Sequence, residues 1–250
     1  MKIVDYESYF ILSGSLHKFW NNGEHNYNDL SFTNLVSTIK SIEKGFDLKL
    51  DETKIVNLEF GLNITTPILS TEIFLRGLIL HKGKHTLNDY KNHFEFKNKS
   101  VGGGDYRQAK RQQFYIKIYD KAKQYKLDEP LIRLEIKYIK SKIINRLGIY
   151  SLDDLLNIKI LKKLHLDLLK KWDEVLFINQ NIDGKYFSKT HKENLTNFKN
   201  QFFWLDLYKT KSNQHRQYYF NLVNNLNECY GSNIKDEIKT ALNQKFESSF

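Results

Sequence analysis

Three segments of the chain alternate between apolar and polar residues with a period of two. They span residues 55–64, 114–120 and 131–138. Successive side chains of a strand point to opposite faces, so each segment is predicted to be a strand with one buried and one polar face. The apolar positions are Val56, Leu58, Phe60, Leu62 and Ile64, then Phe114, Ile116 and Ile118, then Ile132, Leu134 and Ile136. A short strand is also predicted at residues 14–19, before the turn residues Asn21-Asn22-Gly23.

Other segments have the apolar spacing of helices. Residues 32–46 are predicted to form a helix with Asp29 or Ser31 as its N-cap, and a short helix is expected after Ser70. Beyond Gly148 the chain is predicted to be almost entirely helical. This part combines a leucine-rich stretch over residues 152–176 with further helices at 190–208, 211–228 and 233–247.

Strands with one apolar face need helices to cover that face. The pattern therefore predicts an α+β fold, in which helices pack on one face of an antiparallel-rich sheet and a helical C-terminal region follows. We expect an α+β domain over residues 1–148 and a helical region over 149–250. The polar segment 82–107 is interpreted as a hairpin or a mobile loop, with Gly102-Gly103-Gly104 as its most flexible point. It lacks the Lys-Ser/Thr of a phosphate-binding loop, so no nucleotide site is expected there.

The composition is that of a globular protein. The 250 residues are 40% hydrophobic and 27% charged, and no apolar run is long enough to span a membrane. Acidic residues occupy the N-terminal positions where a signal peptide would be apolar. The single cysteine, Cys229, excludes an internal disulfide and a multi-cysteine zinc site. We expect a protein of the bacterial host cytoplasm with no membrane partner.

Charge points to a polyanionic partner. The formal net charge is +10 and the isoelectric point about 9.3. Residues 107–142 hold eleven basic and four acidic side chains, a net charge of +7. Clustered basic residues favour nucleic-acid binding, although a basic surface kept for solubility is the alternative interpretation. The candidate DNA-binding residues are Arg107, Lys110, Arg111, Lys117, Lys123 and Lys137.

If the three strands are neighbours, their polar faces bring together a set of residues with a chemical meaning. These residues are Glu59, Lys117, Tyr119, Arg133 and Glu135. A tyrosine hydroxyl can attack a DNA phosphodiester, and carboxylates can hold Mg²⁺ or Mn²⁺ that offsets the developing charge. Lys117, Lys121 and Arg133 can neutralise the phosphate. The alternative is that these residues only form the solvated face of a sheet.

Two stretches carry a family resemblance. Gln113–Tyr125, which contains Tyr119-Asp120-Lys121, and Leu131–Lys137, which contains Arg133-Leu134-Glu135, resemble the filamentous-phage gene-two replication initiators. Members of that family are tyrosine endonucleases related in activity to the HUH nickases. Weaker similarity is present at residues 14–19, 24–29, 57–63 and 148–156, so that the resemblance spans about positions 14–178.

The resemblance implies specific roles. It implies an HUH/ferredoxin-like nickase core with Tyr119 as nucleophile and Lys121 and Arg133 as catalytic partners. Metal ligands are expected at Glu59, Glu135 and His25, the last followed by Asn26. Two departures concern the metal: the chain has no His-hydrophobic-His triplet, and some relatives carry a Glu and a His where Gln108 and Arg111 stand here. Further candidates are the rival nucleophile Tyr115 and the histidines His17, His81 and His85.

These features lead to one principal functional hypothesis. The chain is expected to nick single-stranded or hairpin origin DNA, leaving a 5′-phosphotyrosine and a 3′-hydroxyl that primes rolling-circle replication. A host helicase and a host polymerase are further candidate partners. The alternatives are a non-catalytic repressor or origin-binding protein, and a tyrosine transposase or relaxase with the same chemistry.

Overall fold

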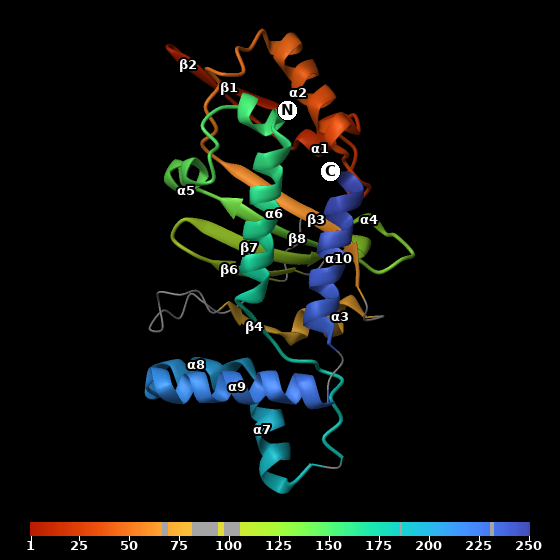
Figure 1. The fold of residues 1–250 in the computed structure, drawn as a ribbon, viewed down its shortest axis with the longest axis vertical. Helices are drawn as coiled ribbons and strands as arrows, with labels where there is room; N and C mark the ends of the chain where they lie inside the picture. Colours follow the sequence, from red (N-terminus) through yellow and green to blue (C-terminus); the bar gives the residue numbers. More distant parts are fainter. Residues whose placement is uncertain (67–69, 82–94, 98–105, 186, 231–232) are drawn as a thin grey trace.

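The structure is a computed structural model that describes residues 1–66, 70–81, 95–97, 106–185, 187–230 and 233–250. Its main feature is an antiparallel sheet with the strand order β3-β8-β7-β6-β5 (Figure 1). Three of its strands are those predicted from alternation, so the antiparallel sheet and the mixed α+β class are confirmed. The strands are β3 (Leu58–Thr65), β8 (Leu131–Tyr138), β7 (Phe114–Asp120), β6 (Tyr106–Lys110) and β5 (Glu95–Lys97).

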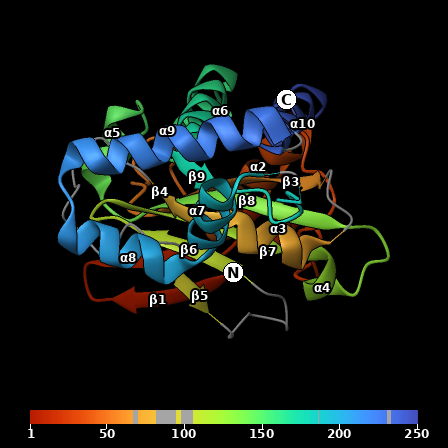
Figure 2. The same ribbon diagram turned by 90° about the horizontal axis from the view of Figure 1, so that it is seen from below.

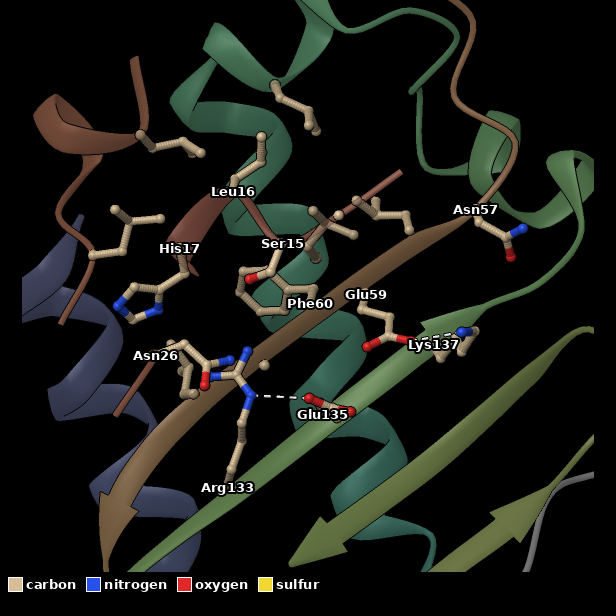
Figure 3. Close-up of a pocket in the computed structure, with 18 of the residues that line it drawn as sticks. Ser15, Leu16, His17, Asn26, Asn57, Glu59, Phe60, Arg133, Glu135 and Lys137 are labelled. Carbon is tan, nitrogen blue, oxygen red and sulfur yellow. Dashed lines mark hydrogen bonds and ion pairs between the residues drawn. The ribbon is translucent and has the colours of Figure 1, made fainter. Parts of the chain in front are cut away.

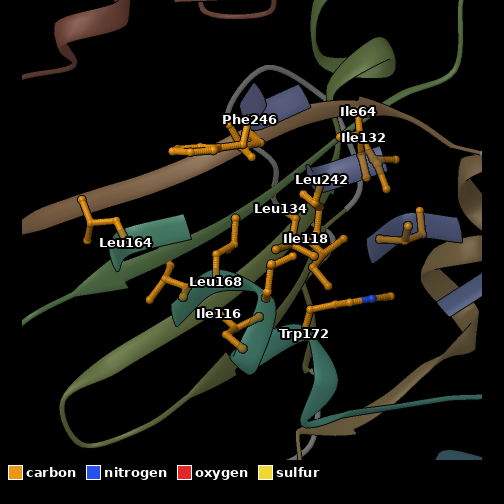
Figure 4. Close-up of a cluster of buried hydrophobic side chains, with 14 of the residues drawn as sticks. Ile64, Ile116, Ile118, Ile132, Leu134, Leu164, Leu168, Trp172, Leu242 and Phe246 are labelled. Atoms are coloured by element: carbon orange, nitrogen blue, oxygen red, sulfur yellow. The ribbon is translucent and has the colours of Figure 1, made fainter. Parts of the chain in front are cut away.

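Two long helices, α6 (Ile158–Asp173) and α10 (Ile234–Ser249), cover one face of this sheet (Figures 1 and 2). Apolar side chains from both layers meet between them (Figure 4): Ile64, Ile116, Ile118, Ile132 and Leu134 from the sheet, and Leu164, Leu168, Trp172, Leu242 and Phe246 from the helices. The indole Nε1 of Trp172 donates to the carbonyl of Lys235 at 2.8 Å, which joins the two helices. This core includes residues on both sides of position 148, where the domain division was expected.

The N-terminal residues form a hairpin and two helices beside the sheet. Among the described strands, β1 (Lys2–Tyr6) and β2 (Tyr9–Ser13) pair only with each other. They are followed by α1 (Leu16–Trp20) and α2 (Phe32–Phe46). Shorter helices connect the later elements: α3 (Thr71–Gly77), α4 (Lys121–Tyr125), α5 (Ser141–Arg146) and the 3-10 helix η2 (Asp153–Leu156).

A second lobe lies beyond one end of the main sheet (Figure 1). It consists of β4 (Leu78–His81) paired with β9 (Val175–Phe177), together with α7 (Lys189–Lys199), α8 (Gln201–Thr210) and α9 (Asn213–Tyr230). This lobe has its own hydrophobic core, in which the rings of Trp204 and Phe220 stack with centroids 5.6 Å apart. Within the described residues, no helix combines the length and apolar composition needed to cross a membrane.

Local capping signals explain where several helices begin. The helix predicted at residues 32–46 is confirmed, and Ser31 is its N-cap because its hydroxyl accepts a hydrogen bond from the backbone N–H of Asn34 at 3.1 Å. The short helix after Ser70 is also confirmed, with that serine as its cap.

Two expectations are corrected. The strand predicted at residues 14–19 is wrong, because Ser15 caps α1 by accepting from the N–H of Lys18 at 3.2 Å. The helix expected at 190–208 is interrupted at Asn200, which ends α7 and caps α8. Within the described residues after Gly148, the named elements are helices as expected, apart from the three-residue β9, which pairs with β4. Of segment 82–107, the described β5 and β6 pair antiparallel, whereas Gly102-Gly103-Gly104 lie outside the described residues.

Candidate active site

The open face of the sheet, opposite α6 and α10, carries the expected polar residues. The register sets Tyr119 opposite Arg133 and Lys117 opposite Glu135 on β7 and β8. β8 lies between β7 and β3, and Gly61 of β3 is the residue that pairs with Glu135 from the β3 side. A Cβ at Gly61 would collide with the Cβ of Glu135 and lie 2.7 Å from a backbone oxygen of β8. Glycine at this position therefore leaves room for the carboxylate.

Glu135 is the centre of the site. Its Oε2 accepts hydrogen bonds from the Tyr119 hydroxyl at 3.2 Å and from Arg133 Nε at 2.9 Å, and its Oε1 accepts one from Lys117 Nζ at 3.1 Å. Burial alone would raise the pKa of this carboxyl group, but the positive charges of Arg133 and Lys117 outweigh burial and lower it. Glu135 is therefore a carboxylate that orients one hydroxyl and two cations.

Tyr119 is held as a neutral phenol. Burial and then the negative charge of Glu135 raise its pKa well above the ordinary value, and Arg133 opposes this only in part. A phenol is a weak nucleophile in this form, so attack on a phosphorus centre requires a base that takes the proton.

The ammonium group of Lys117 lies between two carboxylates. Its Nζ is 3.1 Å from Glu135 Oε1 and 3.4 Å from Glu59 Oε1, while Lys137 Nζ is 2.8 Å from the same Glu59 oxygen. Burial disfavours the charge of Lys117, but the two carboxylates outweigh burial and raise its pKa. The point between Glu59 and Glu135 thus favours a cation, and Lys117 provides one.

This arrangement fits a divalent ion that also binds the substrate. Within the described residues, no three His, Cys, Asp or Glu side chains are grouped as a complete metal site. Mg²⁺, however, commonly binds through one or two carboxylates and the phosphate of its substrate. Glu59 and Glu135 can supply those carboxylates at the point that now holds the Lys117 ammonium.

Lys121 lies beneath the site with its side chain almost completely buried. Its Nζ donates to Asn26 Oδ1 at 2.6 Å and to Gln124 Oε1 at 2.9 Å. The same nitrogen lies 5.3 Å from the ring centroid of Tyr119 and 4.7 Å from that of Tyr125. Burial, assisted by the nearby charge of Arg133, lowers the pKa of Lys121 to about 7. Near neutral pH a substantial fraction of this lysine is therefore a free amine.

A loop from the N-terminal region is fastened to the open face through Asn63. The side-chain nitrogen of Asn63 donates to the carbonyls of Asn26, Tyr27 and Asn28 at 2.9, 3.1 and 3.3 Å. Its Oδ1 accepts from Arg133 Nη1 at 3.1 Å. Asn63 therefore positions both the arginine and the loop that supplies Asn26 to Lys121.

The site opens into a cavity of about 980 Å³ (Figure 3). Polar residues from β3 and β8 form one side, where Figure 3 shows Glu59, Arg133 and Glu135 pointing into the same space. The segment 11–17 lines another part of the cavity, and side chains of α6 and α10, such as Leu164 and Lys245, line a third part. Tyr119 is also among the residues that line the cavity.

The expected DNA-binding residues divide between the two faces of the sheet. Lys117 and Lys137 belong to the site, and Lys110 lies on the same face in register with Tyr115. Lys123 is exposed on α4. Two arginines lie elsewhere: Arg107 is buried with its Nε donating to the carbonyl of Leu75 at 3.1 Å, and Arg111 lies near the buried His81.

The histidines are distributed over several environments. The ring of His25 stacks on Tyr27 with centroids 4.1 Å apart, and the structure does not group His25 with the two carboxylates as a metal site. Burial lowers the pKa of His17 to about 4, so its neutral ring donates from Nε2 to Asn28 Oδ1 at 2.7 Å. His81 is buried with Nε2 3.1 Å from Glu174. His85 lies outside the described residues.

The contacts that Asn63 and Asn26 make in the site were not predicted from the sequence. Asn63 stands four residues after Glu59 in the strand predicted at residues 55–64, so the alternation already placed it on the polar face without indicating its contacts. Asn26 was noted only beside His25, whereas its side chain contacts Lys121 and also accepts from the Tyr125 hydroxyl at 3.0 Å. No local signal in the sequence predicts these contacts over more than ninety residues.

Comparison with protein-family models, curated proteins and solved structures gives no match to this chain. Function is therefore inferred from the residues, their geometry and the resemblance noted above. At the cavity these residues combine a tyrosine hydroxyl with cations around one buried carboxylate, and Lys121, a lysine of lowered pKa, is buried beside the tyrosine ring.

Proposed function

We propose that this chain is a tyrosine nickase that cleaves single-stranded origin DNA and so starts rolling-circle replication of a phage or plasmid. The observation that carries the proposal is the hydroxyl of Tyr119, which lines the cavity and donates to Glu135 beside Arg133 and Lys117. A hydroxyl nucleophile surrounded by cations suits an anionic phosphodiester better than a neutral substrate.

In the proposed reaction the Tyr119 oxygen attacks the scissile phosphorus. The new Oη–P bond forms as the P–O3′ bond breaks, and the leaving oxygen takes a proton from water to become the 3′-hydroxyl. The strand remains joined to the protein through a 5′-phosphotyrosine. Arg133 and Lys117 stabilise the charge on the non-bridging oxygens.

Lys121 is the proposed acceptor of the Tyr119 proton. It is the buried amine next to the phenol ring, and its pKa of about 7 makes the free base available near neutral pH. Glu135 accepts the hydrogen bond of the phenol and orients the hydroxyl, but its own lowered pKa makes it the weaker base.

Mg²⁺ or Mn²⁺ is the proposed cofactor, held by Glu59 and Glu135. When bound, such an ion supplies positive charge to the phosphate oxygens as a Lewis acid. His25 is retained as a proposed ligand only from the family resemblance, because the structure stacks its ring on Tyr27.

Two further features support the nickase proposal. The sheet is covered by helices on one face and carries the tyrosine on the other, as expected for an HUH-like core. The resemblance to the gene-two initiators falls on β7, α4 and β8, which are the elements that supply the site. Origin DNA with a hairpin is the proposed partner, and a host helicase and polymerase would act on the released 3′ end.

The test is formation of a covalent protein–DNA adduct. The protein is incubated with a pool of random-sequence single-stranded oligonucleotides and Mn²⁺, and adducts that survive denaturation are recovered and sequenced. We expect an adduct with the natural chain, none with Tyr119→Phe, and an undiminished yield with Tyr115→Phe, which changes the neighbouring tyrosine on the same strand face. An adduct that persists in Tyr119→Phe would overturn the assignment of the nucleophile.

The second candidate is a DNA-binding protein without catalysis. The observation in its favour is that Lys117, Lys137 and Arg133 already offset both carboxylates, so these acids need not weaken DNA binding. If no DNA in the pool forms an adduct while single-stranded DNA still binds, this second function replaces the first. A transposase or relaxase would form the same adduct and differ in its DNA substrate.

A further inference from the structure

The β1–β2 hairpin exposes apolar residues on both of its faces. Its strands pair from Lys2 with Ser13 to Tyr6 with Tyr9, and no other strand of the described residues pairs with it. Five of its apolar or aromatic side chains are between 38% and 58% exposed: Ile3, Tyr6, Tyr9, Phe10 and Ile11. An isolated hairpin is marginally stable in water, and a dense group of exposed apolar residues marks an interaction surface.

This hairpin begins at the candidate active site. Residues 11–15, at the end of β2 and just beyond it, line the same cavity as Tyr119. Figure 2 shows β1 on the opposite side of the main sheet from α6 and α10, which is the side of the open face. A DNA strand that leaves the cavity on this side therefore passes the hairpin.

The tip of the hairpin is formed by two stacked tyrosines. The rings of Tyr6 and Tyr9 lie 4.8 Å apart with an interplanar angle of 19°, on either side of the two-residue turn 7–8. The charged side chains of the hairpin are Lys2, Asp5 and Glu7. These side chains sum to a net charge of −1, so the hairpin does not neutralise phosphates, and the contact it offers to DNA is stacking of its rings on bases.

We propose that the β1–β2 hairpin is a wedge that engages the junction between single-stranded and duplex DNA beside the active site. The Tyr6–Tyr9 pair stacks on the terminal base pair and separates it. This inference rests on the proposed nickase function, because a cleaved strand that belongs to an origin hairpin has such a junction next to the cut. A cavity of about 980 Å³ has the size of a small-molecule site, so it takes part of one strand and leaves the duplex outside.

The probe is a synthetic DNA hairpin with a single-stranded oligothymidine tail and 2-aminopurine in the base pair next to the tail. We expect the natural chain to raise 2-aminopurine fluorescence, because the base becomes unstacked. The double substitution Tyr6→Ser, Tyr9→Ser should abolish the rise and weaken binding to the junction about tenfold. Binding to oligothymidine alone should change much less.

Two variants serve as controls. Tyr6→Phe with Tyr9→Phe keeps both rings and should retain the fluorescence rise. Tyr150→Ser removes a tyrosine that is 61% exposed far along the chain, and it should behave as the natural protein does. Circular dichroism of each variant shows whether the fold is kept. We expect it to be kept, because the substituted side chains are exposed.

The outcomes separate this inference from the proposed function. If the natural chain forms a covalent adduct but leaves the probe fluorescence unchanged, the wedge is wrong and the nickase stands. If the fluorescence rise depends on both rings but no adduct is ever formed, the junction surface stands and the nickase fails. If the serine double variant converts a dimer into a monomer while the fluorescence rise persists, the hairpin is a contact between two copies and the wedge is overturned.

Discussion

At the scale of single residues, the site is organised by the balance of charges around two carboxylates. Glu135 is buried and would be costly as a lone anion, but Arg133 and Lys117 each contact one of its oxygens. Glu59 also forms an ion pair with Lys117, and it forms a second ion pair with Lys137. The cations that stabilise these two carboxylates are also the ones that would contact a phosphate in the proposed reaction, so the folded site already contains positive charge for such a substrate.

The first prediction concerns the pH dependence of adduct formation. Because Lys121 has a pKa of about 7, the rate should rise as pH passes through about 7 and then level off as the amine loses its proton. Lys121→Met should remove this rise and slow adduct formation about 100-fold or more. The rate is measured by denaturing electrophoresis on an oligonucleotide recovered from the pool. An unchanged pH profile in the variant would exclude Lys121 as the base.

The pH dependence of the free energy of unfolding reports the lowered pKa of Lys121 independently of activity. The unfolded chain keeps the proton up to its ordinary pKa of 10.5, whereas the folded chain loses it above about 7. Between these values the unfolded state binds more protons, so the free energy of unfolding should increase with pH. Lys121→Met should lack this contribution, and urea unfolding at a series of pH values compares the two proteins.

At the scale of elements, the last helix of the chain completes the core of a sheet formed much earlier in the sequence. Besides its apolar contacts, α10 is fixed to α6 by polar ones: the ring of His165 stacks on Phe246 at 4.3 Å and bonds Asn243 through Nε2 at 2.9 Å. Helices from the C-terminal part therefore support the open face from behind.

We predict that Leu242→Ala destabilises the protein by about 3 kcal/mol, because Leu242 is fully buried between α10 and the sheet and its truncation leaves a cavity. Gln244→Ala is the matched control on the exposed side of the same helix and should change stability little. The free energy of unfolding is measured in urea. Equal stability of the two variants would show that α10 does not support the sheet.

At the scale of the whole molecule, the two faces of the sheet differ in what lies on them. One face is covered by α6 and α10, and the other carries the polar residues of the candidate site, with the β1–β2 hairpin on the same side (Figures 2 and 3). The second lobe has a separate aromatic core and joins the main body through β4 and β9. A polyanion should therefore bind to one side of the protein only.

This asymmetry predicts that the salt dependence of DNA affinity changes when a lysine of the open face is substituted but not when a lysine of the covered side is substituted. Each lysine that contacts a phosphate contributes about 0.7 to the slope of log affinity against log salt concentration for a single strand. Lys110→Ala, on the open face, should reduce the slope by about that amount. Lys170→Ala, exposed on α6 on the covered side, should leave it unchanged. Fluorescence anisotropy with labelled oligothymidine measures both, and equal effects would contradict binding by one face.

The sequence by itself determined the three central strands and the composition of their polar face. Period-two alternation placed Lys117 and Tyr119 on one face of their strand and Arg133 and Glu135 on one face of theirs, whereas the β7–β8 pairing that brings the four together came from the tertiary structure. Capping serines likewise located the starts of α2 and α3, since a cap depends on residues only three apart. The short strand at 14–19 failed for the same local reason, because a capping serine outweighed a brief apolar pattern.

Only the tertiary structure decided what surrounds that face. The contact of Asn26 with Lys121, the fastening of its loop by Asn63 and the position of α10 behind the sheet join segments that are distant along the chain. Such contacts depend on how whole elements pack, which no local period records. Burial then set the lowered pKa of Lys121 and the raised pKa of Tyr119, because the loss of water around a group is a property of the folded molecule.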